Sequence, residues 1–155
     1  MRPTLKEELQ QKKPFVSLEQ EAHLSVMRTA AALDHTFEQL LKPSGISGTQ
    51  YNLLRILRGA EPNGLCRNEL RDRMVTRMPD VTRLLDRLED AGLVTRERGT
   101  EDRRQVSTRI SARGRKLVDS LDSTVNAEHK KALGHMTETQ LRKLIELLGI
   151  ARARP

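Results

Sequence analysis

The middle third of the chain concentrates side chains that can bind a polyanion. Residues 67–109 contain eleven basic residues, all of them Arg, together with nine acidic residues. An Arg guanidinium presents a planar fork of donors that fits phosphate oxygens and the edge of guanine. The whole chain carries a net charge of +7, which also favours a nucleic acid as partner. A GC-rich genome would enrich Arg as well, so the spacing of these residues matters more than their number.

Residues 79–92 have the spacing of a helix with one apolar and one polar face. Pro79 suits the first turn of a helix, and Gly92 suits a left-handed C-terminal cap. Apolar residues recur at i, i+3, i+4 and i+7: Val81, Leu84, Leu85 and Leu88. The polar residues that remain in this region, together with Pro79, are predicted to contact DNA. They are Thr76, Arg77, Asp80, Thr82, Arg83 and Arg87. A carboxylate at a helix start also complements the helix dipole, and for Asp80 we favour this second role.

The elements that must position this helix can be read from capping signals and periodicity. A hydroxyl residue stands three positions before Gln at Ser17, Ser47 and Thr137, which predicts three helix starts. Helical spacing predicts a short helix over 67–74 and a further helix after Ser111, while alternation of period two predicts strands over 93–98 and 106–110. The expected fold is therefore mainly α with a small β-hairpin wing, a winged helix-turn-helix core between long N- and C-terminal dimerisation helices. The predicted parts are an N-terminal arm (1–16), a dimerisation helix (17–44), a DNA-binding lobe (45–111) and C-terminal dimerisation helices (112–155).

Four further polar residues lie at predicted helix starts: Ser47, Thr49, Arg67 and Asn68. Free backbone N–H groups and short polar side chains at such positions suit contacts with phosphate. Plain helix capping is the alternative role, and it is compatible with the first.

Two segments give the chain a resemblance to a known family. Residues 102–114 (DRRQVSTRISARG) and residues 81–94 (VTRLLDRLEDAGLV) are similar to the wing and to the recognition helix with its exit in the MarR family of transcriptional regulators. Their order and spacing extend the resemblance over roughly residues 20–150. It implies a homodimeric, sequence-specific regulator of transcription, expected to be a repressor, that binds a pseudo-palindromic site in double-stranded DNA.

The resemblance also implies roles for individual residues. Arg104 matches the wing-tip Arg that enters the minor groove, Asp102 matches the acid that orients it, and Arg103, Arg98 and Arg96 become phosphate neighbours or supports of the wing. The expected dimer interface includes the apolar stripe of the last helix: Leu141, Leu144, Ile145 and Leu148. A small aromatic or phenolic effector would bind between the dimer helices and the DNA-binding lobe, with four candidate contacts: His23, Met27, Arg28 and Tyr51.

Other classes of function find less support in the sequence. The single cysteine, Cys66, excludes an intramolecular disulfide and fits a reducing compartment, and no apolar run is long enough for a membrane span. We therefore expect a cytoplasmic, nucleoid-associated protein that is not an enzyme and uses no cofactor or metal. The histidine pairs His23 with His35 and His129 with His135 lack a spacing that would place them on one helix face. Redox sensing by Cys66 is an open alternative for regulation, and a winged-helix module that binds proteins instead of DNA is the alternative function.

Overall fold

The computed structural model describes residues 3–77, 80–98 and 106–153. Its helices are α1 (Leu5–Glu8), α2 (Leu18–Leu41), the short 3-10 helix η1 (Lys42–Ser44), α3 (Gly48–Gly59), α4 (Arg67–Arg73), α5 (Val81–Asp90), α6 (Ala112–Leu133) and α7 (Glu138–Arg152). Its strands are β1 (Leu65–Cys66), β2 (Val94–Arg98) and β3 (Val106–Ile110). This element order confirms the predicted mainly α fold with a small wing hairpin.

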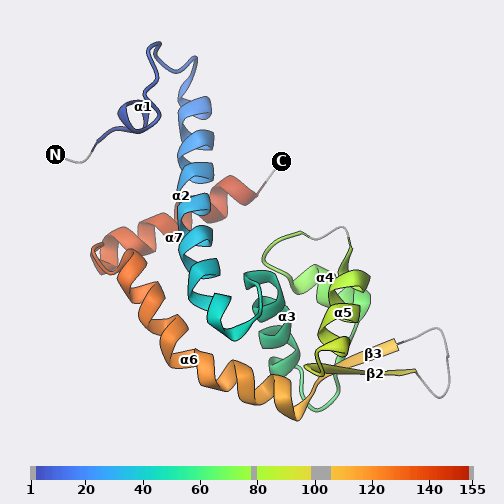
Figure 1. Cartoon of the computed structure of the whole chain (residues 1–155). Coiled ribbons are helices and arrows are strands. Elements are labelled where there is room, and N and C mark those ends of the chain that lie inside the picture. The colour runs from blue at the N-terminus through green and yellow to red at the C-terminus, as the bar shows by residue number, and fades with distance from the viewer. Residues whose placement is uncertain (1–2, 78–79, 99–105, 154–155) are drawn as a thin grey trace.

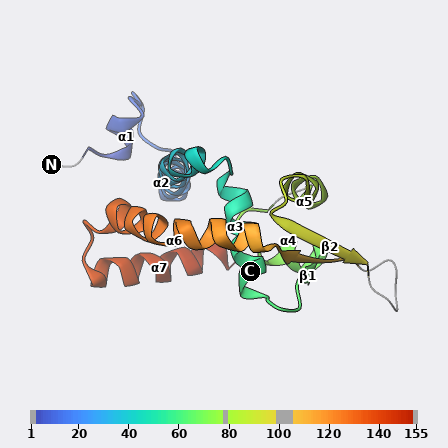
Figure 2. The same ribbon diagram turned by 60° about the horizontal axis from the view of Figure 1, so that its bottom comes forward.

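The elements gather into a lobe and an extended arrangement of long helices. Figure 1 shows α3, α4, α5 and the hairpin together on one side, while α2 and α7 extend away from them and α6 runs between the two parts. Figure 2, turned by 60°, shows the same division, with the hairpin at one end of the molecule. The lobe therefore presents α5 and the hairpin away from the long helices.

The predicted helix starts are confirmed by side-chain caps. Ser17 accepts a hydrogen bond from the backbone N–H of Gln20 at 3.2 Å, while Ser47 and Thr137 each form a complete capping box with the Gln three residues later. Such caps satisfy backbone donors that a helix leaves unpaired. Helix α1 was not predicted, because its four residues span barely one turn and show no periodicity.

Two glycines fix the junction where α5 leads into β2. Gly92 adopts a left-handed φ of 71°, and the N–H groups of Gly92 and Leu93 donate to the carbonyls of Glu89 and Leu88 at 2.8 and 2.9 Å, which closes the helix. Gly114 on α6 packs so closely that a Cβ there would collide with the carbonyl oxygen of Leu93. The end of α5, the start of β2 and the start of α6 are therefore held together.

The sheet contains a strand that the sequence does not reveal. β1 pairs antiparallel with β3, which also pairs antiparallel with β2, so the strand order is β1-β3-β2. Two residues are too few to show a period. The predicted hairpin is confirmed, and its inward residues Thr108 and Ile110 are buried.

The long helices α2 and α7 bury far fewer side chains than the lobe does. Among the described residues of α2, only Leu41 is buried, and none of α7 is. Large apolar side chains stay exposed on both helices: Leu18, Val26, Met27 and Leu33 on α2, and Ile145, Leu147 and Ile150 on α7. On α6 the buried stripe is Gly114, Val118, Leu121 and Val125, with Leu117 only half-buried.

Candidate nucleic-acid interface

Helix α5 has an anchored face and a free face. The anchored face is 0–8% exposed and belongs to the hydrophobic core: Val81, Leu84, Leu85 and Leu88. Thr82, Arg83 and Arg87 are exposed on the rest of the helix. The structure therefore brings these three predicted reading residues together on one surface, where they can reach base edges and phosphates.

Asp80 is the N-cap of α5. Its Oδ1 accepts a hydrogen bond from the backbone N–H of Arg83 at 2.9 Å. The side chain is exposed, but this oxygen is already used to hold the first turn of the helix. The geometry favours the capping role over a contact with cytosine.

Substitutions at Asp80 separate the cap from a base contact. Asp80→Ala is expected to lower the free energy of unfolding by about 0.5–2 kcal/mol, because the N–H of Arg83 loses its acceptor. Asp80→Asn keeps an oxygen acceptor at the same position and serves as the matched control, with a loss of a few tenths of a kcal/mol. Urea denaturation of both variants measures the difference, and equal losses would show that the cap is not what stabilises the helix.

Arg67 and Asn68 lie exposed at the start of α4. The Arg67 guanidinium donates to the hydroxyl oxygen of Thr82 at 3.3 Å. Glu69 accepts from the backbone N–H of Cys66 at 2.8 Å, and this hydrogen bond lowers the pKa of the Glu69 carboxyl. Arg67 thus adds a cation beside Thr82, and the two residues form one polar surface.

The start of α3 is already occupied by groups of the chain itself. Ser47 accepts from the N–H of Gln50 at 3.2 Å, and the N–H of Gly48 donates to a carboxylate oxygen of Glu38 on α2 at 2.6 Å. Thr49 is half-buried and lines a cavity beside Tyr51. The structure therefore gives Ser47 a capping role, and a phosphate contact by Ser47 or Thr49 stays a prediction.

The structure describes only some of the other residues that were predicted to contact DNA. Thr76 and Arg77 are exposed in the segment that precedes α5. Pro79, Asp102, Arg103 and Arg104 lie outside the described residues. The wing-tip roles that the resemblance implies for these last three thus remain predictions.

An ionic clamp ties strand β2 of the wing to helix α5. Arg96 on β2 donates from Nε to Glu89 on α5 at 2.8 Å, and its Nη2 contacts both Glu89 and, at 2.7 Å, Asp86. The hydrogen bond with Glu89, followed by the one with Asp86, raises the pKa of Arg96. Arg96 is therefore a support of the wing, one of the two roles considered for it. Two acidic residues three positions apart on one helix are the feature of the sequence that could have indicated the partners of Arg96.

A second ionic group ties the lobe to α6. Arg58 on α3 donates to Asp119 at 2.6 Å and to both carboxylate oxygens of Asp122 at 2.8 and 3.0 Å. The hydrogen bond with Arg58 lowers the pKa of Asp122 and that with Asp122 raises the pKa of Arg58. Such charged hydrogen bonds are stronger than neutral ones and fix the direction of the side chains, so they orient the lobe on the long helix.

The four candidate effector contacts do not come together in the structure. Tyr51 is buried and lines a cavity of about 340 Å³ with Phe37 and His129. His23, Met27 and Arg28 are exposed on α2 and line neither this cavity nor the adjoining one of about 570 Å³. Arg28 instead contacts Glu8 of the arm at 3.8 Å. The N-terminal part of α2, where His23, Met27 and Arg28 lie, extends away from the lobe (Figure 1), so an effector contact by these three residues stays a prediction.

The residues predicted for the dimer interface lie on one side of α7. Leu141, Leu144 and Leu148 are half-buried, and Ile145 is 67% exposed. Among the residues with a described placement, no three His, Cys, Asp or Glu side chains are grouped as ligands of a metal ion. Within the same residues, no helix combines the length and the apolar character needed to cross a membrane.

Comparisons with known proteins agree with this geometry. The model of the MarR family matches residues 46–106. The HTH-type transcriptional repressor YetL of Bacillus subtilis is 30% identical over 129 residues, which are 83% of this chain and 77% of YetL. A crystal structure of a mutant MarR from E. coli complexed with operator DNA superposes with a TM-score of 0.77 at 22% identity, over 84% of this chain and 93% of that one.

A second solved structure matches a similar share of this chain at a higher sequence identity. The MarR transcription factor from Planctomyces limnophilus is 39% identical, with a TM-score of 0.68, over 88% of this chain and 99% of its own. This identity spans the long helices as well as the lobe. The anchored α5, the clamped wing and this relationship together place the chain in the MarR family of transcriptional regulators.

Proposed function

We propose that the protein is a sequence-specific double-stranded DNA-binding regulator, acting as a homodimeric repressor on a pseudo-palindromic operator. The observation that carries the proposal is the free face of α5, where Thr82, Arg83 and Arg87 are exposed while the opposite face is locked into the core. A helix held in this way can enter the major groove without rearrangement of the lobe. The repressor named YetL supports the direction of regulation.

Selection from a random pool of duplex DNA tests this function without knowledge of the operator. Because two copies of α5 would enter successive major grooves, the selected sequences are expected to contain an inverted repeat with half-site centres about 10 base pairs apart. Enrichment of no shared motif would contradict sequence-specific recognition. It would favour the alternative function, a winged-helix module that binds proteins.

The homodimer is supported by the apolar side chains that α2 and α7 leave uncovered. Exposed large apolar side chains gathered on two helices are typical of a surface that a partner covers. The exposed residues of both helices lie outside the lobe, which would leave each α5 free for DNA. The covering partner that we propose is a second copy of the same two helices. Cytoplasmic, nucleoid-associated localisation follows from this role.

A charge on the apolar face of α7 is expected to weaken the dimer. Ile145→Glu would raise the dissociation constant by about tenfold or more, because it buries an unpaired carboxylate in the interface. Ile145 is 67% exposed in the single chain, so the monomer should keep its fold. Thr139→Glu places the same charge elsewhere on α7 and is the matched control. Sedimentation velocity measures both, and an Ile145→Glu protein as dimeric as its control would contradict the interface.

The wing tip is proposed to contact the minor groove through Arg104, as the resemblance implies. Arg104→Ala should weaken operator binding by about tenfold, since a narrow minor groove attracts a guanidinium. Arg104→Lys keeps the charge and should recover part of the affinity. Fluorescence anisotropy with the selected duplex measures both variants, and full affinity of Arg104→Ala would remove the wing from the interface.

Effector control is proposed for the cavity beside Tyr51. Phe37 contacts Tyr51 edge-on at 5.6 Å and stacks with His129 at 6.0 Å between centroids, and the cavity also contains Arg55 and Thr76, which precedes α5. Aromatic walls beside a cation suit a small aromatic or phenolic ligand. Saturating 4-hydroxybenzoate is expected to lower DNA affinity several-fold in the wild type and less in Arg55→Gln. An unchanged affinity would contradict an effector of this type.

A further inference from the structure

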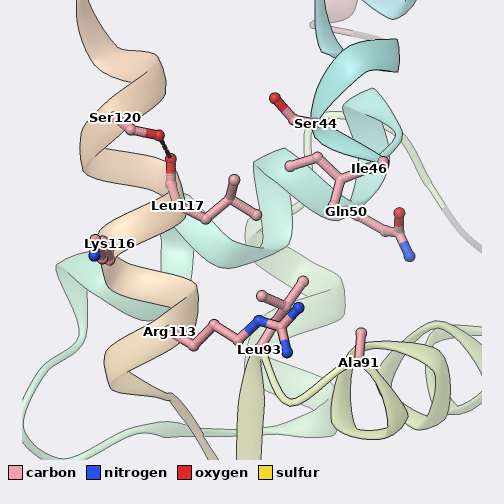
Figure 3. Close-up of a pocket in the computed structure, with 10 residues that line it drawn as sticks. Ser44, Ile46, Gln50, Ala91, Leu93, Arg113, Lys116, Leu117 and Ser120 are labelled. Carbon is pink, nitrogen blue, oxygen red and sulfur yellow. Dashed lines mark hydrogen bonds between the residues drawn. The ribbon is translucent and has the colours of Figure 1, made fainter.

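A second cavity lies on the other side of α3, where three separate segments meet. It has a volume of about 550 Å³ and is lined by the turn between η1 and α3, by the turn between α5 and β2, and by the first turns of α6. Figure 3 shows Ile46 and Gln50 on one side, with Arg113 and Leu117 reaching from α6 on the other. This size is typical of a pocket for a small molecule.

The cavity combines an apolar floor with two cations. Ile46 and Leu93 are 7% and 5% exposed and form the floor, with half-buried Leu117 beside them. Arg113 and Lys116 lie three residues apart on α6, and Figure 3 shows Arg113 reaching towards Leu93 while Lys116 lies at the outer edge of the helix. Neither side chain forms an ion pair or hydrogen bond with any residue that the structure places, and no acidic residue lines the cavity.

The walls of this cavity are held in place before any ligand arrives. The Ser111 hydroxyl donates to the carbonyl of Gly92 at 2.7 Å, and its N–H donates to the carbonyl of Leu93 at 3.0 Å. Gly114 packs against the same carbonyl of Leu93. The turn after α5 is therefore fixed to α6, and a ligand would lose little free energy in ordering the site.

We propose that this cavity binds a small organic anion with an apolar body, of the class of a monocarboxylate. The guanidinium of Arg113 would pair with the carboxylate, Lys116 would add positive charge at the rim, and the hydrocarbon part would cover Ile46, Leu93 and Leu117. A bare inorganic anion would leave this apolar floor uncovered. The site is separate from the cavity beside Tyr51, and because it contacts the turn that ends α5, its ligand would also touch the base of the reading helix.

Hexanoate titrated into the ¹⁵N-labelled protein tests the proposal. Saturable shifts are expected at the amides of Gly45 and Ala91, which line this cavity, with little change at Gly48, which lines the other one. Hexan-1-ol, which lacks the charge, and inorganic phosphate, which lacks the apolar body, should each bind at least about tenfold more weakly. Shifts confined to Gly48, equal binding of phosphate, or no saturable shift would each overturn the proposal.

Variants identify the two cations as the source of affinity. The double variant Arg113→Gln with Lys116→Gln is expected to weaken hexanoate binding by about tenfold or more. Lys130→Gln with Lys131→Gln removes the same two charges from α6 outside the cavity and should leave binding unchanged. If the double variant does not give the dispersed spectrum of a folded protein, Arg113→Gln alone replaces it. Equal effects of the pocket and control variants would overturn the assignment.

Discussion

Leu88→Ala is expected to lower the free energy of unfolding by about 2–5 kcal/mol. Leu88 is fully buried, and it lies on the side of α5 that packs into the core. Truncation removes apolar contacts and leaves a cavity that the surrounding helices cannot fill completely. Because α5 is also the reading helix, DNA binding should be lost at temperatures where the variant unfolds.

The control for this prediction lies one residue away on the same helix. Arg87 is exposed, so Arg87→Ala should change the free energy of unfolding by no more than about 0.5 kcal/mol. Urea denaturation of both variants, followed by circular dichroism, gives the comparison. If the two variants were equally stable, the orientation of α5 described above would be wrong.

Arg83→Ala is expected to have the opposite pattern, with a large loss of DNA affinity and little loss of stability. Its side chain is exposed on the free face of α5, while its backbone N–H remains bonded to Asp80. Loss of a forked contact with a base costs about 1–3 kcal/mol, which is a factor of roughly 5 to 150 in affinity. The loss should be greatest for the selected operator and smaller for unrelated DNA.

Charge alone must be separated from base recognition in this experiment. Lys131→Ala removes one positive charge from α6, outside the lobe, and should weaken operator and unrelated DNA equally and slightly. Fluorescence anisotropy at one fixed salt concentration compares the three proteins, because DNA affinity depends steeply on salt. An Arg83→Ala protein that kept its preference for the operator would exclude Arg83 from base reading.

Local signals in the sequence predicted most of the fold. The caps at Ser17, Ser47 and Thr137 and the exit of α5 at Gly92 depend on residues within a few positions of each other. Such short-range hydrogen bonds leave a clear pattern in the sequence. The change from helical periodicity to alternation of period two after Gly92 is also a local signal, and it predicted the hairpin.

Contacts between distant segments could not be predicted in this way. The Glu38 carboxylate that occupies the N–H of Gly48, the clamp of Arg96 on α5, and the bonds from Arg58 to α6 all join separate elements. Their partners are set by how the helices pack, which single-sequence periodicity does not define. The same reason explains why Tyr51 lines a cavity while His23 does not.

Binding of the purified protein to the DNA that flanks its own gene tests the central claim most directly. The measurement compares this DNA with a scrambled duplex of the same length over a series of salt concentrations. We predict a preference of about 10³-fold or more for the flanking DNA, with an affinity that falls steeply as salt rises. Equal, weak binding to both duplexes would contradict the account, and it would direct attention to protein partners of the winged-helix lobe.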